Sequence, residues 1–249
     1  PGEAWCFQRL NDCDCMTIKS ILLGLLIMLV SSVRADGDNV SATILWYAEQ
    51  EPGVDPYRMR YLVTPDFLRS DDGVDSENFL LFDRKRKTIY SVVGENRSIL
   101  QIDGGVETYA APQELAMRVE TRADTQAPKV GGRPPVALEL LAGETVCKSA
   151  VIAPGFLDDE REVFRDFSHV VAAQQARTMN NTPPELRTHC FLARYLYAHD
   201  FHLAEGMLLA EWSPSGERRE LVDIEEHVAV PSSLFVLPDD YAVVRTSER

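Results

Sequence analysis

The sequence predicts an α+β fold, in which an antiparallel sheet packs against two amphipathic helices. Three observations support this class. Short β-branched and aromatic segments recur at a spacing of roughly ten residues through the first half. Apolar residues then repeat with the three-to-four spacing of a helix, and the C-terminal part returns to strand-like alternation. The chain is 45% hydrophobic and 26% charged, which is typical of a globular protein.

The predicted strands of the first half are separated by turns that contain Pro, Gly, Asp or Asn, with no helical pattern between them. This arrangement is typical of an antiparallel meander. Weaker patterns predict three further strands before the helical region, at 115–121, 135–141 and 145–153. The five segments of the meander are 41–48 (SATILWYA), 57–63 (YRMRYLV), 78–82 (NFLLF), 88–93 (TIYSVV) and 98–102 (SILQI).

Two helices follow. The stretch DDEREVFRDFSHVVAAQQARTMNN places acids at its start and Arg177 near its end, which suits the helix dipole, and its apolar residues share one face. The next stretch begins with Thr182, two prolines and Glu185, the pattern of a capping box, and predicts a second helix that continues to about Tyr197. Cys190 lies on the apolar face of this second helix.

The N-terminal part predicts export. Residues 16–35 contain Lys19, an uninterrupted apolar run at 21–30 and small residues up to Ala35, which is the pattern of a secretory signal peptide cleaved after Ala35. The run is about half of the roughly 20 residues that cross a bilayer, so we expect no permanent membrane span. We interpret residues 1–15 as an over-extended translation start and 36–249 as a single periplasmic domain.

Removal of the leader leaves Cys147 and Cys190 as the cysteines of the mature chain. Two cysteines in an exported protein are most simply a disulfide. Cys147 falls on a predicted strand and Cys190 on a predicted helix, so the bond would pin that helix to the sheet. A metal knuckle at residues 13–15 would need more ligands than that segment offers.

The net charge and the absence of known catalytic motifs disfavour several classes of function. The net charge of −14 disfavours nucleic acid and anionic lipid headgroups as partners. The sequence has no nucleophile elbow, P-loop, zinc-protease helix or dinucleotide fingerprint. It therefore predicts no catalytic residue and no cofactor, and an enzymatic role is disfavoured.

One constellation could hold a metal or act in acid–base chemistry. The C-terminal part predicts a two-stranded hairpin, and if Trp212 pairs with Glu217, then His202 faces His227 and lies near Glu225. A slip of one residue in register would separate these side chains. Polar residues on the exposed side of a strand also need no function.

Two segments carry a resemblance. NFLLFDRKRKTIYSVVGENRSILQI is similar to a strand, basic turn and strand pattern of uncharacterised bacterial periplasmic proteins, and SSLFVLPDDYAVV resembles their closing segment through Phe235, Pro238 and Tyr241. Those families are grouped with the LolA/LolB-like lipoprotein carriers. The resemblance implies an open antiparallel half-barrel, covered by helices, with a concave apolar cavity for acyl chains. This chain departs from the carriers because its helices come late and a disulfide would stiffen a helical lid.

Three functional hypotheses follow. The first is a periplasmic binding or carrier module whose apolar cavity takes a lipid or acyl ligand, with a lipid or lipoprotein as partner. The second is an envelope module that binds another protein and no small ligand, and the third is a metal-dependent enzyme. Aromatic residues on the strands are candidates to line a cavity, although aromatics at strand spacing also form simple core. They are Trp46, Tyr47, Phe79, Phe82 and Tyr90.

Overall fold

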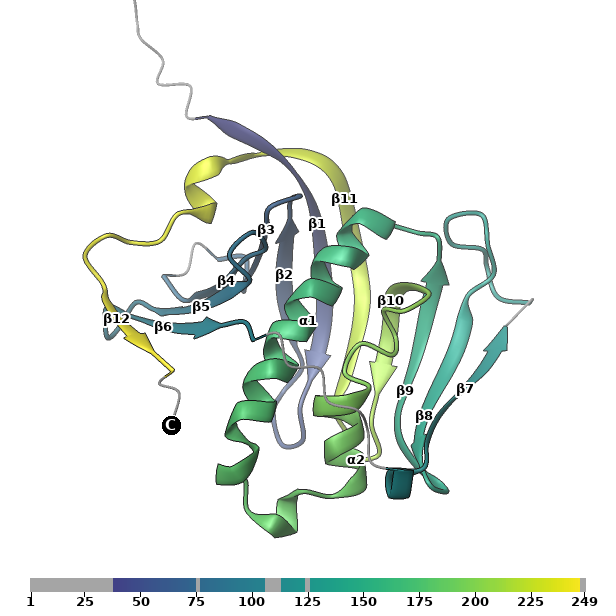
Figure 1. The fold of residues 1–249 in the computed structure, drawn as a ribbon. Coiled ribbons are helices and arrows are strands. Elements are labelled where there is room, and N and C mark those ends of the chain that lie inside the picture. Colours follow the sequence, from purple (N-terminus) through teal and green to yellow (C-terminus); the bar gives the residue numbers. More distant parts are fainter. Residues whose placement is uncertain (1–37, 75–76, 106–112, 124–125, 247–249) are drawn as a thin grey trace, which may run out of the picture. The chain divides into compact units, whose positions relative to one another are not determined.

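The computed structural model describes residues 38–74, 77–105, 113–123 and 126–246. Twelve strands form one open sheet, and the long helix α1 (Asp158–Thr178) packs across one of its faces (Figure 1). Strands account for 46% and helices for 22% of the described residues. The protein is therefore mainly β. The prediction of an α+β fold, an antiparallel open half-barrel with two amphipathic helices packed on it, is wrong.

The order of strands across the sheet is β12-β6-β5-β4-β3-β2-β1-β11-β10-β9-β8-β7. The predicted meander is confirmed in β1 to β6, and the last long strand, β11, joins the two halves by pairing with β1. The strands are β1 (Asn39–Gln50), β2 (Tyr57–Val63), β3 (Phe67–Asp71), β4 (Phe79–Asp83), β5 (Thr88–Val93), β6 (Ser98–Asp103), β7 (Met117–Ala123), β8 (Val136–Ala142), β9 (Thr145–Pro154), β10 (Gly206–Trp212), β11 (Arg218–Pro231) and β12 (Ala242–Arg245).

The sheet differs from a purely antiparallel half-barrel at particular strands. The strand β12 pairs with β6 in parallel, so the sheet is mixed. The strand β3 was not predicted, because its sequence FLRSD ends in polar residues that do not alternate with apolar ones. The two terminal strands in the order, β12 and β7, do not pair with each other, so the sheet is not closed.

The helix α1 is confirmed, with acids in its first turn and Arg177 in its last. Thr43 Oγ1 on β1 donates a hydrogen bond of 2.6 Å to Glu160 of this helix. Within the described ranges, none of the helices has the length and hydropathy needed to cross a membrane. The short helical turns are η1 (Gln113–Leu115), η2 (Met179–Asn181), η3 (Pro184–Leu186) and η5 (Ser232–Phe235).

The second predicted helix is much shorter than expected. The proline pair starts only the single 3-10 turn η3, and the backbone then leaves helical geometry. Thr188, not Thr182, caps the helix α2 (His189–Leu192), and its hydroxyl accepts a hydrogen bond from the Phe191 amide. The π-helical segment η4 (Ala193–Tyr197) follows directly.

Cys147 on β9 and Cys190 on α2 form a disulfide, as predicted, with their Cα atoms 5.0 Å apart. The pairing of β8 with β9 is irregular at this point, since Leu140 faces Lys148 and Leu141 faces Val146, which leaves Cys147 as the extra residue of a bulge. A bulge changes the direction of neighbouring side chains. The bulge lets Cys147 reach α2 while Lys148, the next residue, also lies on the helix side of the sheet.

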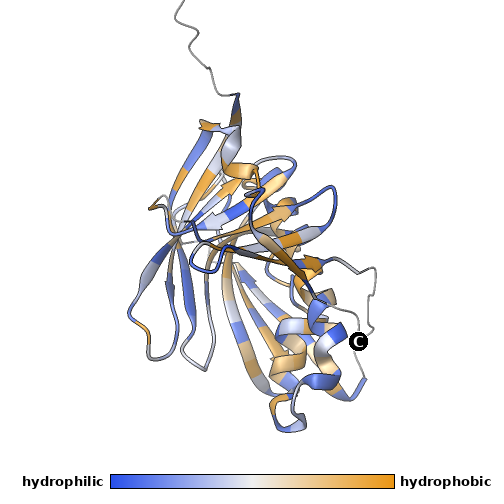
Figure 2. Cartoon of the chain, turned by 90° about the vertical axis from the view of Figure 1, so that its left-hand side faces the viewer, coloured by the Kyte–Doolittle hydropathy of each residue, from blue (hydrophilic) through white to orange (hydrophobic). Residues whose placement is uncertain are grey.

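Side chains alternate between the two faces of the sheet, and apolar and polar segments alternate along the strands in Figure 2. On the face that α1 covers, called the helix face below, a buried cluster includes Leu45, Tyr47, Phe82 and Phe164. The opposite face, called the outer face, has its own buried cluster. Its members are Ala42, Ile44, Leu62, Leu81, Val230 and Phe235.

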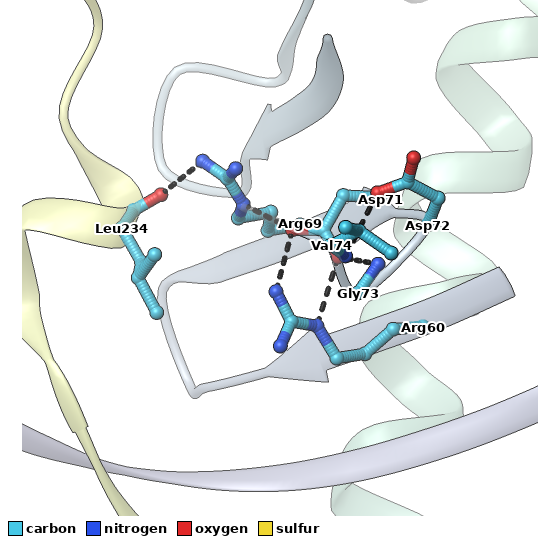
Figure 3. Close-up of polar contacts among 7 residues, drawn as sticks. All are labelled: Arg60, Arg69, Asp71, Asp72, Gly73, Val74 and Leu234. Carbon is cyan, nitrogen blue, oxygen red and sulfur yellow. Dashed lines mark hydrogen bonds and ion pairs between the residues drawn. The ribbon is translucent and has the colours of Figure 1, made fainter. Parts of the chain in front are cut away.

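A group of charged residues fixes the outer face (Figure 3). The Asp71 carboxylate accepts two hydrogen bonds from Arg60, at 2.8 and 3.0 Å, one from Arg69 at 2.7 Å and one from the Gly73 amide at 3.0 Å. Arg69 also donates to the Leu234 carbonyl at 2.8 Å. Burial alone would raise the pKa of Asp71, but the two arginines outweigh this effect and hold that pKa below its usual value. This group is called the outer charged cluster below.

Candidate ligand-binding cavity

A cavity of about 420 Å³ lies between the helix face of the sheet and the helical segments above it. The helix α1 contributes Phe164 and Phe167 to its wall, and β1 and β2 contribute Tyr47 and Tyr61. Most of the exposed cavity surface is apolar. Further apolar lining residues are Leu68, Leu80, Val171, Leu203, Met207 and Leu208.

A row of alternating charges crosses one end of this cavity on four neighbouring strands. Its members are Glu49 on β1, Arg219 on β11, Glu211 on β10 and Lys148 on β9, called the charged row below. Arg219 lies opposite Glu49 in one strand pair and opposite Glu211 in the other. The Arg219–Glu49 ion pair measures 2.9 Å and the Lys148–Glu211 pair 2.7 Å. The row therefore carries two positive and two negative charges.

Tyrosines extend this polar network. Tyr61 donates a hydrogen bond of 2.9 Å to Glu49 and accepts one of 3.2 Å from Arg219. Tyr47 donates to the Leu208 carbonyl at 2.9 Å. Burial is the main cause that raises the pKa of Tyr61 to about 12, and it also raises the pKa of Tyr47. Both hydroxyls therefore stay protonated at neutral pH.

Charge states in the row follow from burial and neighbours. Burial alone would raise the pKa of Glu211, but Lys148, His202 and Arg219 outweigh it and lower that pKa to about 2. Burial lowers the pKa of His202 to about 4, so this imidazole is neutral at pH 7. The neighbouring carboxylates and tyrosines raise the pKa of Arg219, although burial acts against the charge.

The aromatic residues predicted to line a cavity are divided between the faces. Tyr47 lines the cavity. Phe82 is fully buried on the helix face and packs edge-on against Phe167, with ring centroids 5.8 Å apart. The other three, Trp46, Phe79 and Tyr90, are partly buried on the outer face against its cluster.

The structure does not bring His202 and His227 together. Trp212 pairs with Arg218, so the register differs by one residue from the predicted pairing with Glu217. In the turn, the Ser213 amide donates a hydrogen bond to the Glu217 carbonyl, so this pair closes a loop of three residues where four were predicted. His202 precedes β10 and lines the cavity, whereas His227 lines a separate pocket near the start of α1. Glu225 pairs with Ile44, away from His202.

A different group of possible metal ligands lies beside the cavity. Among the described residues, His169, His199 and Asp200 each offer a ligand atom within 4.8 Å of the others. His199 Nε2 is 3.2 Å from His169 Nδ1, which a hydrogen bond between the rings explains. Arg165 donates to the Asp200 carboxylate at 3.0 Å and so competes with a metal for it. The group is a weak candidate for a metal site and gives no evidence for an enzyme.

The charged row was not predicted from the sequence. Lys148 and Glu211 are each the one charged residue of their strand, in TVCKSAVIAP and GMLLAEW. A charge at such a position is costly to bury unless it is paired, and this was the available signal. The pairing itself depends on the order β9-β10-β11-β1, which brings together residues far apart in the chain.

Comparisons with known proteins identify neither a family nor a function for this chain. No family model and no curated protein matches the chain. An uncharacterized conserved protein from Thermus thermophilus is similar in structure, with a TM-score of 0.42, 10% identity, and coverage of 82% of this chain and 90% of that one. PNGF-II, in a C2 crystal form, has a TM-score of 0.39 and 9% identity, over 83% of this chain. This chain spans 31% of the PNGF-II chain. Likenesses at these TM-scores assign neither a family nor a function.

Proposed function

We propose that this protein is an exported binding or carrier module that holds a lipid or acyl ligand in the cavity on the helix face. The observation that carries the proposal is the cavity itself, with about 420 Å³ of space and mainly apolar walls. Ligand sites in proteins are typically clefts of about 300 to 1,000 Å³ with few polar groups. A periplasmic location follows from the predicted signal peptide and belongs to the same proposal.

The energetics favour an acyl chain in this cavity. Each methylene group that leaves water for an apolar wall contributes about 0.8 kcal/mol. The aromatic rings of Phe164 and Phe167 on α1 and the side chains of Leu203 and Met207 offer such a wall. The disulfide to Cys190 holds α2 against β9, and η4, which follows α2 directly, contributes Arg194 and Tyr195 to the wall, so the bond restrains this part of the wall before a ligand arrives.

A second candidate is an envelope module that binds another protein. The specific observation in its favour is the open sheet, whose two terminal strands are β12 and β7. Val243 and Val244 on β12 are 53% and 56% exposed. A strand edge with free backbone groups can pair with an extended segment of a partner.

Native mass spectrometry of the full chain, purified from the producing cells without detergent, tests the first candidate. We expect a stoichiometric mass increment that organic extraction identifies as an acyl lipid. The variant Val171→Trp places a large side chain on α1 where the cavity opens, since Val171 lines the cavity and is 42% exposed. It should lose the increment, while the control Val243→Trp on β12 should keep it.

Two results would contradict the carrier proposal or the position of its ligand. A bare polypeptide with a blank extract contradicts the carrier proposal and favours the second candidate. Retention of the lipid by Val171→Trp, with a stability equal to that of the wild type, would place the lipid outside the cavity.

A further inference from the structure

A second, smaller chamber of about 240 Å³ also borders the charged row, and all four residues of the row line it. It is lined by Glu51 and Pro52 after β1 and by Trp212 at the end of β10, which is 44% exposed. The chamber and the cavity share five lining residues, so the two spaces are neighbours with a common polar wall. The shared residues are Lys148, Arg194, Tyr195, Glu211 and Arg219.

The walls of this second chamber are charged but balanced. Four carboxylates and four cations line it. Three of the cations are already paired with carboxylates of the same lining, and Arg218 pairs at 2.8 Å with Glu220. The paired sets are Lys148 with Glu211, Arg219 with Glu49, and Arg194 with Glu217; the remaining carboxylate is that of Glu51.

This balance selects against a charged ligand head. An anionic head that enters the chamber finds every cation of the described lining already paired, so it either loses water without compensation or separates an existing ion pair. Removing an ion from water in this way costs several kcal/mol. A cationic head meets the same difficulty with the three paired carboxylates. The fourth, Glu51, is exposed and accepts a hydrogen bond of 2.9 Å from Tyr57, so its attraction for a cation is screened by water. A head that carries no charge, or one of each sign, avoids this cost and can hydrogen-bond to the polar walls.

We propose that the second chamber is a head-group subsite for an acyl amphiphile whose head carries no net charge, and that the chain of this ligand lies in the larger cavity. The inference rests on the proposed function, because it names the class of ligand for the same site. The shared wall supplies the point at which the apolar chain ends and the polar head begins.

Binding of three lauroyl compounds to the full chain tests this inference by calorimetry at pH 8. Monolaurin and lauroyl phosphocholine, whose heads are neutral and zwitterionic, should each bind at least about tenfold more tightly than laurate. The affinity for laurate should rise about tenfold for each unit of pH lowered, because the protonated acid is its uncharged form. Tighter binding of laurate than of the other two overturns the inference and leaves the proposed function standing. Binding of none of the three contradicts both.

A variant that changes the charge of the chamber tests whether the ligand's head group lies there. Glu51 lines the chamber and is exposed, so Glu51→Lys alters its charge at a surface position. We expect the affinity for laurate to rise about threefold and that for monolaurin to stay the same. The matched control Glu95→Lys makes the same charge change at an exposed turn between β5 and β6 and should change neither affinity. Equal effects of the two variants, or no effect of Glu51→Lys, would show that the head does not lie in this chamber.

Discussion

The two faces of the sheet bury charges in different ways. In the outer charged cluster, the Asp71 carboxylate receives four hydrogen bonds and Arg69 reaches a backbone carbonyl as well. Around the cavity on the helix face, buried nitrogen atoms of His202, Arg194 and His199 lack a partner within the described part of the chain. A fully satisfied buried network holds structure, whereas unsatisfied buried groups call for another explanation. We infer that the outer face is a structural support and the helix face is the side that binds.

The largest effect is expected on the outer face. Asp71→Ala removes the buried carboxylate that the buried Arg69 and the partly buried Arg60 share, and loss of one partner of a buried ion pair costs about 3 to 5 kcal/mol. Urea unfolding should show this loss of stability, with monolaurin binding unchanged where the protein is folded. The control Asp55→Ala, at an exposed turn, should have little effect. A stable Asp71→Ala variant that fails to bind ligand would reverse the assignment of the two faces.

The disulfide supports the helix face. In the chain-entropy account, a bond that closes a separation of 43 residues stabilises the protein by about 3 to 4 kcal/mol. The double variant Cys147→Ser/Cys190→Ser should therefore unfold at correspondingly lower urea concentration. Reductant should bring the wild type to the same value and leave the variant unchanged. Equal stability of the oxidised wild type and the variant would argue against the bond.

The stability that the helix face contributes should fall as the pH is lowered. His202 has a folded pKa of about 4, below the ordinary value of 6.5, so its neutral form contributes stability that is present above pH 6.5 and is lost as the pH falls toward 4. The size is up to about 3 kcal/mol. Glu211, with a pKa of about 2, adds a loss of the same sign at lower pH.

The variant His202→Gln should flatten the stability profile between pH 6.5 and 4, measured by urea unfolding. The charged groups near His202 are Glu211, Lys148, Arg219 and Asp200, and none of them is altered by this substitution. The exposed His189→Gln is the matched control and should keep the wild-type slope. An unchanged slope in His202→Gln would show that another group causes the acid sensitivity.

The smallest effect concerns one hydroxyl in the cavity wall. Tyr47→Phe removes the hydrogen bond to the Leu208 carbonyl and should cost about 1 kcal/mol in urea unfolding. Tyr90→Phe, on the outer face, is the comparison. Similar losses of stability in the two variants would mean that the Tyr47 hydroxyl stabilises the fold no more than the Tyr90 hydroxyl does.

Periodicity predicted the local elements well where one kind of residue dominates. The meander and α1 are examples, since their apolar residues repeat at strand or helix spacing. The strand β3 was hidden because Arg69 and Asp71 are polar, and only their mutual pairing makes their burial acceptable. The prediction of the second helix was wrong in its start, because the proline pair begins only the turn η3 and the helix α2 begins after Thr188 instead.

The site was less predictable than the fold. Adjacent residues such as Trp46 and Tyr47 must point to opposite faces, but the sequence does not say which face is hollow. The charged row needs a strand order and a register that local patterns do not specify. His202 lies apart from His227 because it precedes β10, whose pairing with β11 extends only over Ala210–Trp212.

An NMR titration of the full chain with monolaurin tests the difference between the two faces most directly. We expect amide shift changes at the cavity and the charged row, for example at Leu208, Glu211 and Arg219, with the amides of Arg69 and Asp71 unmoved. Shift changes that centre on the outer charged cluster, or no changes at saturating monolaurin, would contradict this expectation.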